Sequence, residues 1–182
     1  MNVVFHTLTG LAVASVISSC KQFGDSTRLF IPSDALFLSA GFAVGLISHG
    51  FLDVAPHTYP IKSAADVSVG LLLIVSALIF ARRRCRALLA VCFVGSIFPD
   101  LVDLGPAILN KRLGWSLPVV KIFPWHWHEY SGSVYDGSRP IKSLVSHLVV
   151  VTIGLGVLYV FRKTLFPLRQ GAGRHGQKMG HP

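Results

Sequence analysis

Five long runs of apolar residues alternate with short polar segments along this chain. The runs cover about residues 3–20, 35–53, 65–81, 87–104 and 142–161. Each has roughly the 17–25 residues that an α-helix needs to cross a hydrocarbon core of about 30 Å. The pattern therefore predicts an all-α fold, a polytopic membrane helix bundle with about five transmembrane helices.

The first run could be read as a cleaved signal peptide, because Ile17-Ser18-Ser19-Cys20 is similar to a lipoprotein cleavage box. However, no Lys or Arg precedes the run, whereas a secretory n-region normally carries one. The run also contains His6. We therefore expect it to remain in the protein as the first helix. The first and second runs are both rich in Gly, Ala and Ser, and such small residues favour close packing against the other helices.

The composition supports a membrane class. Hydrophobic residues make up 52% of the chain and charged residues only 14%, well below the roughly 25% of soluble domains. The net charge is +9, but the basic residues lie between the apolar runs, as in the cluster Arg82, Arg83, Arg84 and Arg86. That placement is typical of charges that set topology and contact lipid headgroups. Membrane lipids are therefore the expected partners, nucleic acid is not, and the sequence indicates no oligomeric state.

The distribution of basic residues also predicts an orientation. With five helices, the loops after the first, third and fifth share one side, which holds the 82–86 cluster and the basic C-terminal segment. Basic loops favour the cytoplasm. We therefore expect an inner-membrane protein with a cytoplasmic C-terminus, and an extracytoplasmic N-terminus, 54–64 loop and 105–141 loop.

The domain organisation is simple. Residues 1–162 are expected to form one membrane-embedded helical domain. Residues 163–182 are polar, basic and rich in glycine, a composition typical of disorder, and are expected to form a cytoplasmic tail. The three cysteines, Cys20, Cys85 and Cys92, have no CxxC spacing, which argues against a disulfide framework or a zinc ribbon.

The rare ionisable residues gather at helix ends. His49 and Asp53 are four residues apart at the end of the second run, so a helix places both on one face. Pro56 ends that helix and can turn His57 back towards the same face. Ionisable groups in a membrane span are costly and need a partner or a function.

The end of the fourth run and the loop after it carry two further motifs. In Phe98-Pro99-Asp100-Leu101-Val102-Asp103 the two carboxylates are three residues apart on one helical face. The segment Trp125-His126-Trp127-His128-Glu129 can adopt either of two backbone conformations. A short helix begun by Pro124 would align His126 with Glu129, whereas an extended backbone would align His126 with His128.

All of these groups fall on the same side of the predicted bilayer, together with His6 at the start of the first helix and His147 near the start of the fifth. One shared site follows. Imidazole and carboxylate without thiolate suit a divalent metal, with Zn²⁺ expected and Mn²⁺ or Fe²⁺ as alternatives. The candidate metal ligands are His6, His49, Asp53, His57, Asp100, Asp103, His126 and His147. Glu129, as a general base, and His128 are the candidate catalytic residues.

Structural interpretations compete with these. A single histidine near a helix end, such as His6, is more often an interfacial or hydrogen-bonded group. Asp53 and Asp103 could cap helices or pair with cations, and Asp66 suits a helix start because of the dipole. Aromatic residues commonly anchor a protein at headgroup depth, and this interpretation applies to Trp115, Trp125 and Trp127.

The His6 helix, the SHGFLDVAPH and FPDLVD segments, and the later HWHE and SHL elements together resemble the small membrane-bound metal-dependent hydrolases. That family is in turn similar to zinc-dependent phospholipase C. The likeness covers most of residues 1–150 as short motifs. It implies metal ligation by His6, Asp100, Asp103, His126 and His147, joined by His49, Asp53 and His57. Where better-known members carry an HRGxTHS-like element, this chain has His126-Trp127-His128-Glu129-Tyr130-Ser131, so either histidine could take the ligand role.

Three functions fit the sequence. The leading hypothesis is a metal-dependent hydrolase of a phosphoester or lipid-like substrate at the extracytoplasmic face. The second is a transporter of metal ions or protons, which also uses intramembrane histidines and carboxylates. The third is a non-catalytic scaffold held by a structural metal.

Overall fold

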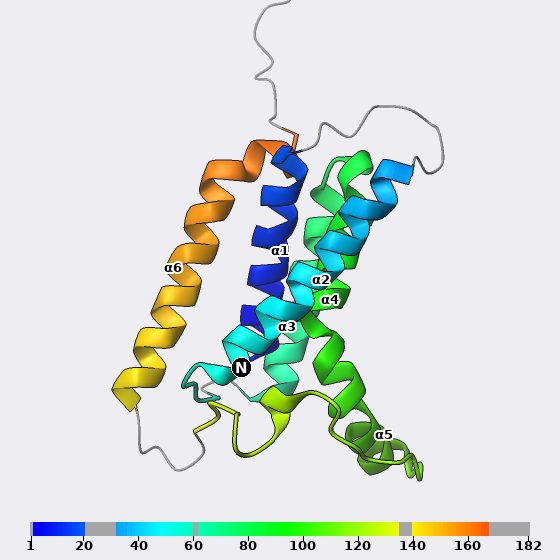
Figure 1. Ribbon diagram of the computed structural model, residues 1–182, viewed down its shortest axis with the longest axis vertical. Coiled ribbons are helices and arrows are strands. Elements are labelled where there is room, and N and C mark those ends of the chain that lie inside the picture. The colour runs from blue at the N-terminus through cyan, green and yellow to red at the C-terminus, as the bar shows by residue number, and fades with distance from the viewer. Residues whose placement is uncertain (1, 21–31, 60–61, 135–139, 168–182) are drawn as a thin grey trace, which may run out of the picture.

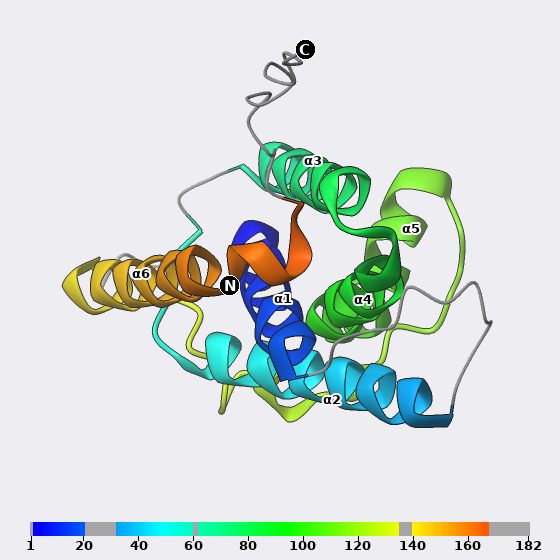
Figure 2. The same ribbon diagram turned by 90° about the horizontal axis from the view of Figure 1, so that it is seen from above.

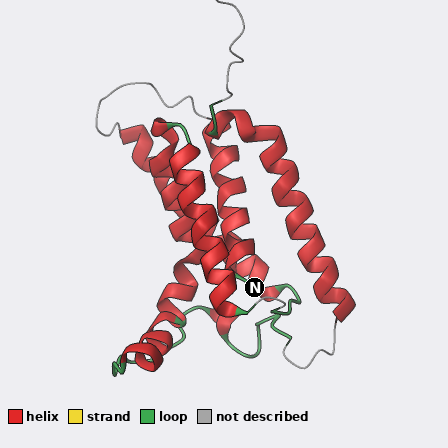
Figure 3. Cartoon of the chain, turned by 180° about the vertical axis from the view of Figure 1, so that it is seen from behind, coloured by secondary structure: helices red, strands yellow, loops and turns green. Residues whose placement is uncertain are grey.

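The computed structural model of the chain describes residues 2–20, 32–59, 62–134 and 140–167. All regular structure in these ranges is helical, apart from one isolated bridge between His57 and Ser133 (Figure 3). The α-helices are α1 (Val3–Cys20), α2 (Pro32–Val54), α3 (Ser63–Phe80), α4 (Arg86–Asp103), α5 (Gly105–Leu113) and α6 (Pro140–Leu165). Two 3-10 turns, η1 (Arg83–Cys85) and η2 (Pro124–His126), complete the elements.

The predicted fold class is confirmed. Five helices, α1, α2, α3, α4 with the preceding η1, and α6, are long and apolar enough to cross a membrane. Their ends differ from the predicted ranges by a few residues. The largest difference is at α6, which continues to Leu165, and the predicted tail beyond residue 167 lies outside the described residues.

One element was predicted wrongly. The segment 105–141 was expected to be a loop, but its first part forms α5 (Figure 1). The local signals are those of an ordinary helix: Pro106 stands in the first turn, Lys111 and Arg112 in the last, and Gly114 ends the helix in the left-handed conformation at φ 69°. The hydropathy pattern missed it because nine residues with two cations cannot cross a bilayer.

Helix α1 occupies the centre of the bundle, with α2, α3, α4 and α6 around it (Figure 2). The tightest packing joins α1, α2 and α4. A Cβ atom at Gly10 of α1 would lie 2.6 Å from Ser96 Oγ of α4, and one at Gly45 of α2 would lie 2.8 Å from the carbonyl oxygen of Cys92. At Gly95 of α4, a Cβ would collide with the backbone of Phe42 in α2. Because glycines occupy these crossings, the three helix backbones approach closely.

The apolar core lies along α4, where Leu88, Leu89, Cys92 and Phe93 are buried. By contrast, α3 and α6 expose most of their apolar side chains, as expected for helices that face lipid rather than water. The packed trio of α1, α2 and α4 therefore provides the rigid frame, and the polar groups lie where these helices reach one end of the bundle.

The start of α1 is fixed by a residue far along the chain. The carboxylate of Asp66 in α3 accepts hydrogen bonds from the backbone N–H groups of Val3 at 2.7 Å and Val4 at 3.1 Å. These N–H groups have no partner within the helix, and an anion at a helix N-terminus is stabilising. Asp66 thus caps α1 rather than its own helix, and it holds in place the turn that carries His6.

Candidate metal centre

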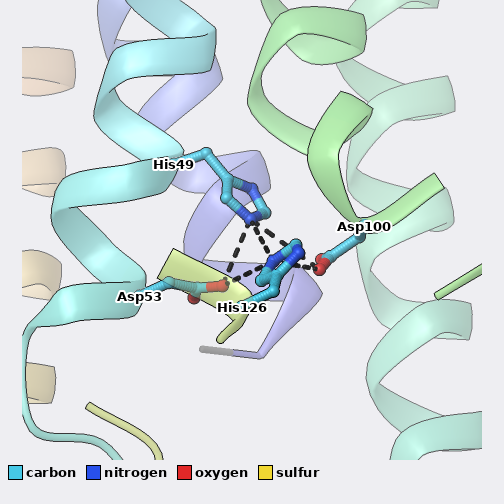
Figure 4. Close-up of side chains that lie close together, drawn as sticks. All are labelled: His49, Asp53, Asp100 and His126. Atoms are coloured by element: carbon cyan, nitrogen blue, oxygen red, sulfur yellow. Dashed lines mark hydrogen bonds and ion pairs between the residues drawn. The ribbon is translucent and has the colours of Figure 1, made fainter. Parts of the chain in front are cut away.

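Four side chains from three elements meet in one place. His49 and Asp53 come from the last turns of α2, Asp100 comes from the last turn of α4, and His126 comes from η2 (Figure 4). Each offers one nitrogen or oxygen atom, and the four atoms all lie within 4.8 Å of one another. His49, Asp53 and His126 are buried, whereas the side chain of Asp100 is 19% exposed.

The five separations that involve an imidazole nitrogen are close to those of tetrahedral coordination. Nε2 of His49 lies 3.2 Å from Oδ2 of Asp53, 3.3 Å from Nε2 of His126 and 3.7 Å from Oδ1 of Asp100. Nε2 of His126 lies 3.1 Å from Oδ2 of Asp53 and 3.4 Å from Oδ1 of Asp100. Ligand atoms about 2.0–2.1 Å from a tetrahedral metal are about 3.3–3.4 Å apart. The group could therefore hold a metal ion with little rearrangement.

Each histidine of the group is oriented by its second ring nitrogen. Nδ1 of His49 lies 2.6 Å from the backbone carbonyl oxygen of Ser96. Because a carbonyl only accepts hydrogen bonds, Nδ1 carries the proton and Nε2 presents a lone pair to the group. Nδ1 of His126 donates in the same way to Oδ2 of Asp103, at 2.8 Å. A metal-binding histidine almost always donates its other N–H to a carbonyl or carboxylate.

Asp103 also holds the loop that delivers His126. Its carboxylate accepts the backbone N–H groups of Ile122 at 2.9 Å and Phe123 at 3.0 Å. One fully buried side chain thus orients the imidazole and fixes the backbone just before η2. Asp103 was predicted as a ligand, and the structure instead brings it against His126 from outside the four-atom group.

The electrostatics of the group call for a cation. Burial opposes a charged His126, but the carboxylates of Asp100, Asp53 and Asp103 outweigh that effect and raise the pKa of its imidazole to about 10. Without a cation, two lone pairs of imidazole nitrogen and two carboxylates would face one another in a buried space. Either a proton on His126 or a metal ion can compensate them, and the tetrahedral spacing of the donors fits the metal.

His6 lies at the edge of the group. Its ring is fully buried and stacks on the ring of His49, with centroids 3.9 Å apart. Nε2 lies 3.2 Å from Oδ1 of Asp53, although neither ring nitrogen has a hydrogen-bond partner of good geometry within the described residues. The two carboxylate oxygens of Asp53 therefore have different neighbours: Oδ2 belongs to the four-atom group and Oδ1 lies towards His6.

His57 takes a separate position. Its Nδ1 donates to the carbonyl oxygen of Ala55 at 2.8 Å, so Nε2 accepts from the hydroxyls of Tyr59 and Ser133, each at 3.1 Å. The backbone N–H of His57 bonds to the carbonyl oxygen of Gly132 at 2.9 Å. Burial lowers the pKa of His57 to about 4. Among its described contacts, His57 joins two loop segments and does not enter the four-atom group.

The remaining predicted residues also lie outside the group. The ring of His147 in α6 stacks on Phe5 of α1 with centroids 4.7 Å apart. His128 and Glu129 are exposed in the loop after η2. Their predicted catalytic roles stay predictions, and the geometry supports His126 rather than His128 as the ligand supplied by this segment.

Two structural partners of the site were not anticipated from the sequence. The carbonyl of Ser96 fixes the tautomer of His49, and Trp125 packs over Gly50, where a Cβ atom would lie 2.8 Å from the indole ring. A backbone carbonyl carries no sequence signal. Gly50, beside His49, was the available hint of a close approach.

Searches of protein-family models, curated proteins and solved structures find no match to this chain.

Proposed function

We propose that the protein is a metal-dependent hydrolase that acts on a phosphoester in a lipid-like substrate. The observation that carries the proposal is the convergence of four donor atoms within 4.8 Å of one another, with both imidazoles oriented through Nδ1. His49, Asp53, Asp100 and His126 would hold the ion, and Zn²⁺ is the proposed metal because it favours this geometry and these ligands. When bound, such a metal polarises a phosphoryl oxygen and lowers the pKa of water.

The exposure of Asp100 and the charge of Lys121 indicate how a substrate would approach the site. Asp100 is the most exposed member of the group, so substrate would approach from its side. Lys121 donates from Nζ to the carbonyl oxygen of His126 at 2.9 Å. Its positive charge lies beside the group and favours an anionic substrate. The ends of α2 and α4 lie where spanning helices reach the headgroup region, which favours a lipid-like ester.

Hydrolysis of a phosphodiester in nanodiscs tests this function. The wild-type protein loaded with zinc should hydrolyse a lipid phosphodiester or bis-p-nitrophenyl phosphate, and His126→Ala should reduce turnover at least about 100-fold. A chelator should abolish activity, and zinc should restore it. Stoichiometric metal with no turnover on any ester would contradict the proposal.

A structural metal is the second candidate. Four protein ligands in a closed tetrahedral arrangement are typical of structural zinc, whereas catalytic zinc usually keeps one position open. Hydrolysis would therefore require the accessible Asp100 to yield its position or the metal to accept a fifth ligand. Metal-dependent folding without turnover would favour this scaffold role.

Transport fits less well. The ionisable groups of α1, α2 and α4 lie near the helix ends, and α6 has none between His147 and Arg162. A transport path would need polar groups across the whole bilayer.

The proposed location is the inner membrane, with the C-terminus in the cytoplasm and the metal centre outside it. The basic 82–86 cluster at the opposite end of the bundle from the centre supports this orientation. A reporter that works only in the cytoplasm should be active when it is fused after residue 182, and a reporter that works only in the periplasm should be inactive there. Activity of a periplasmic reporter at that position would reverse the assignment.

A further inference from the structure

The segment after α4 leaves the bundle at the end that carries the metal centre. Helix α5 projects beyond the end of α4 and lies outside the ring of spanning helices (Figures 1 and 2). We call residues 105–120, which comprise α5 and the chain that follows it, the arm. No residue of α5 is buried, and every residue from 111 to 120 is exposed.

The arm is nevertheless held in a defined shape. The side chain of Asn110 clamps a turn, because its Nδ2 donates to the carbonyl oxygen of Leu117 and its Oδ1 accepts the N–H of Leu117, both at 2.8 Å. Gly114 supplies the left-handed residue that ends α5. At its far end, the arm leads to Ile122, whose N–H is held by Asp103. An ordered turn therefore presents side chains that no other part of the described chain covers.

The exposed side chains of the arm are apolar and basic. Seven large apolar residues are more than a third exposed: Ile108, Leu109, Leu113, Trp115, Leu117, Val119 and Val120. Lys111 and Arg112 add two positive charges, and the arm contains no Asp or Glu. In water this surface would be an aggregation hazard. At a bilayer surface it combines apolar insertion with attraction to anionic headgroups.

The position of the arm favours the membrane surface, rather than another protein, as its binding partner. The α4 span ends at Asp103 and α5 starts two residues later, so the arm begins at headgroup depth. A tryptophan with Lys and Arg near it is the usual anchor at that level. We propose that the arm is an interfacial element that inserts into the leaflet on the side of the metal centre and binds preferentially to anionic lipid.

Insertion of the arm requires neither a bound metal nor catalysis. The arm would keep the mouth of the site at the level of lipid headgroups, and the N–H of Ile122 joins it to Asp103, which orients His126. Loss of arm insertion would leave metal binding measurable, so the two proposals fail separately.

Spin-label depth measurements on the full chain in nanodiscs test the arm. In a Cys20→Ser background, labels at Val120→Cys and Leu113→Cys should be accessible to oxygen and severalfold less accessible to a water-soluble nickel chelate than a label at Tyr130→Cys. Tyr130 is a matched control, because it is also an exposed large side chain on the loops between α4 and α6. The remaining cysteines, Cys85 and Cys92, are buried and should not be labelled.

The charge preference is tested with the pair K111E/R112E. Protection of the Val120→Cys label should be greater in discs of phosphatidylglycerol than of phosphatidylcholine, and the charge reversal should remove that difference. Equal protection of the unreversed protein in both lipids would overturn the anionic preference. Full exposure of both arm labels to the nickel chelate would overturn insertion, as would protection seen only in discs that hold more than one copy of the chain.

Discussion

At the scale of single residues, the metal centre depends on which ring nitrogen of each histidine carries a proton. His49 and His126 have Nδ1 committed to a carbonyl and to a carboxylate, respectively, and both Nε2 atoms point towards Asp53 and Asp100. Residues outside the four-atom group therefore set which lone pairs face the proposed metal. Asp103 is the clearest case, since it accepts three hydrogen bonds from a single loop.

Asp103→Asn tests this role. The amide keeps the shape of the side chain but removes the charge that orients and polarises His126, so metal affinity should fall about 10–100-fold. Competition with a fluorescent chelator measures the change. Tyr130→Phe, in the same loop but exposed, should bind metal as the wild type does. An unchanged affinity in Asp103→Asn would show that His126 needs no such partner.

The junction made by His57 should be sensitive to acid. Its pKa is lowered to about 4 by burial in the folded chain, against about 6.5 when unfolded. Between these values the unfolded state binds more protons, so the contribution of His57 to stability is complete above pH 6.5 and declines as the pH falls towards 4.

The pH dependence of the melting temperature measures this effect. Between pH 7 and pH 5 the wild-type protein should lose more stability than His57→Gln, in which no group titrates at that position. Parallel curves for the two proteins would mean that His57 does not stay neutral in the folded state.

The sequence located most of the site but did not separate ligands from supports. The spacing of His49 and Asp53 on one helical face was sufficient to pair them, because that rule is local. The position of His57 could not be derived in this way. The backbone N–H of His57 bonds to the carbonyl oxygen of Gly132, which lies 75 residues later in the chain. No local sequence pattern encodes such a distant partner.

At the scale of elements, helix crossings set the distances within the centre. Gly45 and Gly95 let α2 and α4 approach closely well inside both helices, and this approach brings the last turns of both helices within reach of one ion. Small residues in the first two helices were recognised in the sequence. Which of them lie at a crossing could not be predicted, because small residues also face lipid.

Gly95→Ala should disturb this crossing. The added Cβ would collide with the backbone of Phe42, and overpacking of this kind costs about 1–3 kcal/mol. We expect a lower midpoint of unfolding in detergent and weaker metal binding, since α2 and α4 must move apart. Gly156→Ala is the matched control, because among the described residues nothing outside its own turn of helix lies within 4 Å of the added Cβ. Equal midpoints for both variants would contradict the crossing argument.

At the scale of the whole molecule, the bundle is asymmetric from end to end. One end holds the basic turn at η1, and the other gathers the buried histidines and carboxylates from α1, α2, α4 and η2. This gathering follows from helix direction, because α2 and α4 finish where α1 starts. Hydropathy alone was enough to predict it. The arm was missed at the same scale because a short, partly basic helix gives no spanning signal.

The central claim is that this end of the bundle binds a divalent metal through four side chains. Metal content of the protein, purified in detergent and measured by mass spectrometry, tests it most directly. At least one equivalent of tightly bound divalent metal per chain is predicted for the wild type, with loss of that metal in His126→Ala while the helical content is preserved. A folded wild-type protein that holds no metal, even after incubation with zinc and removal of the excess, would contradict the account.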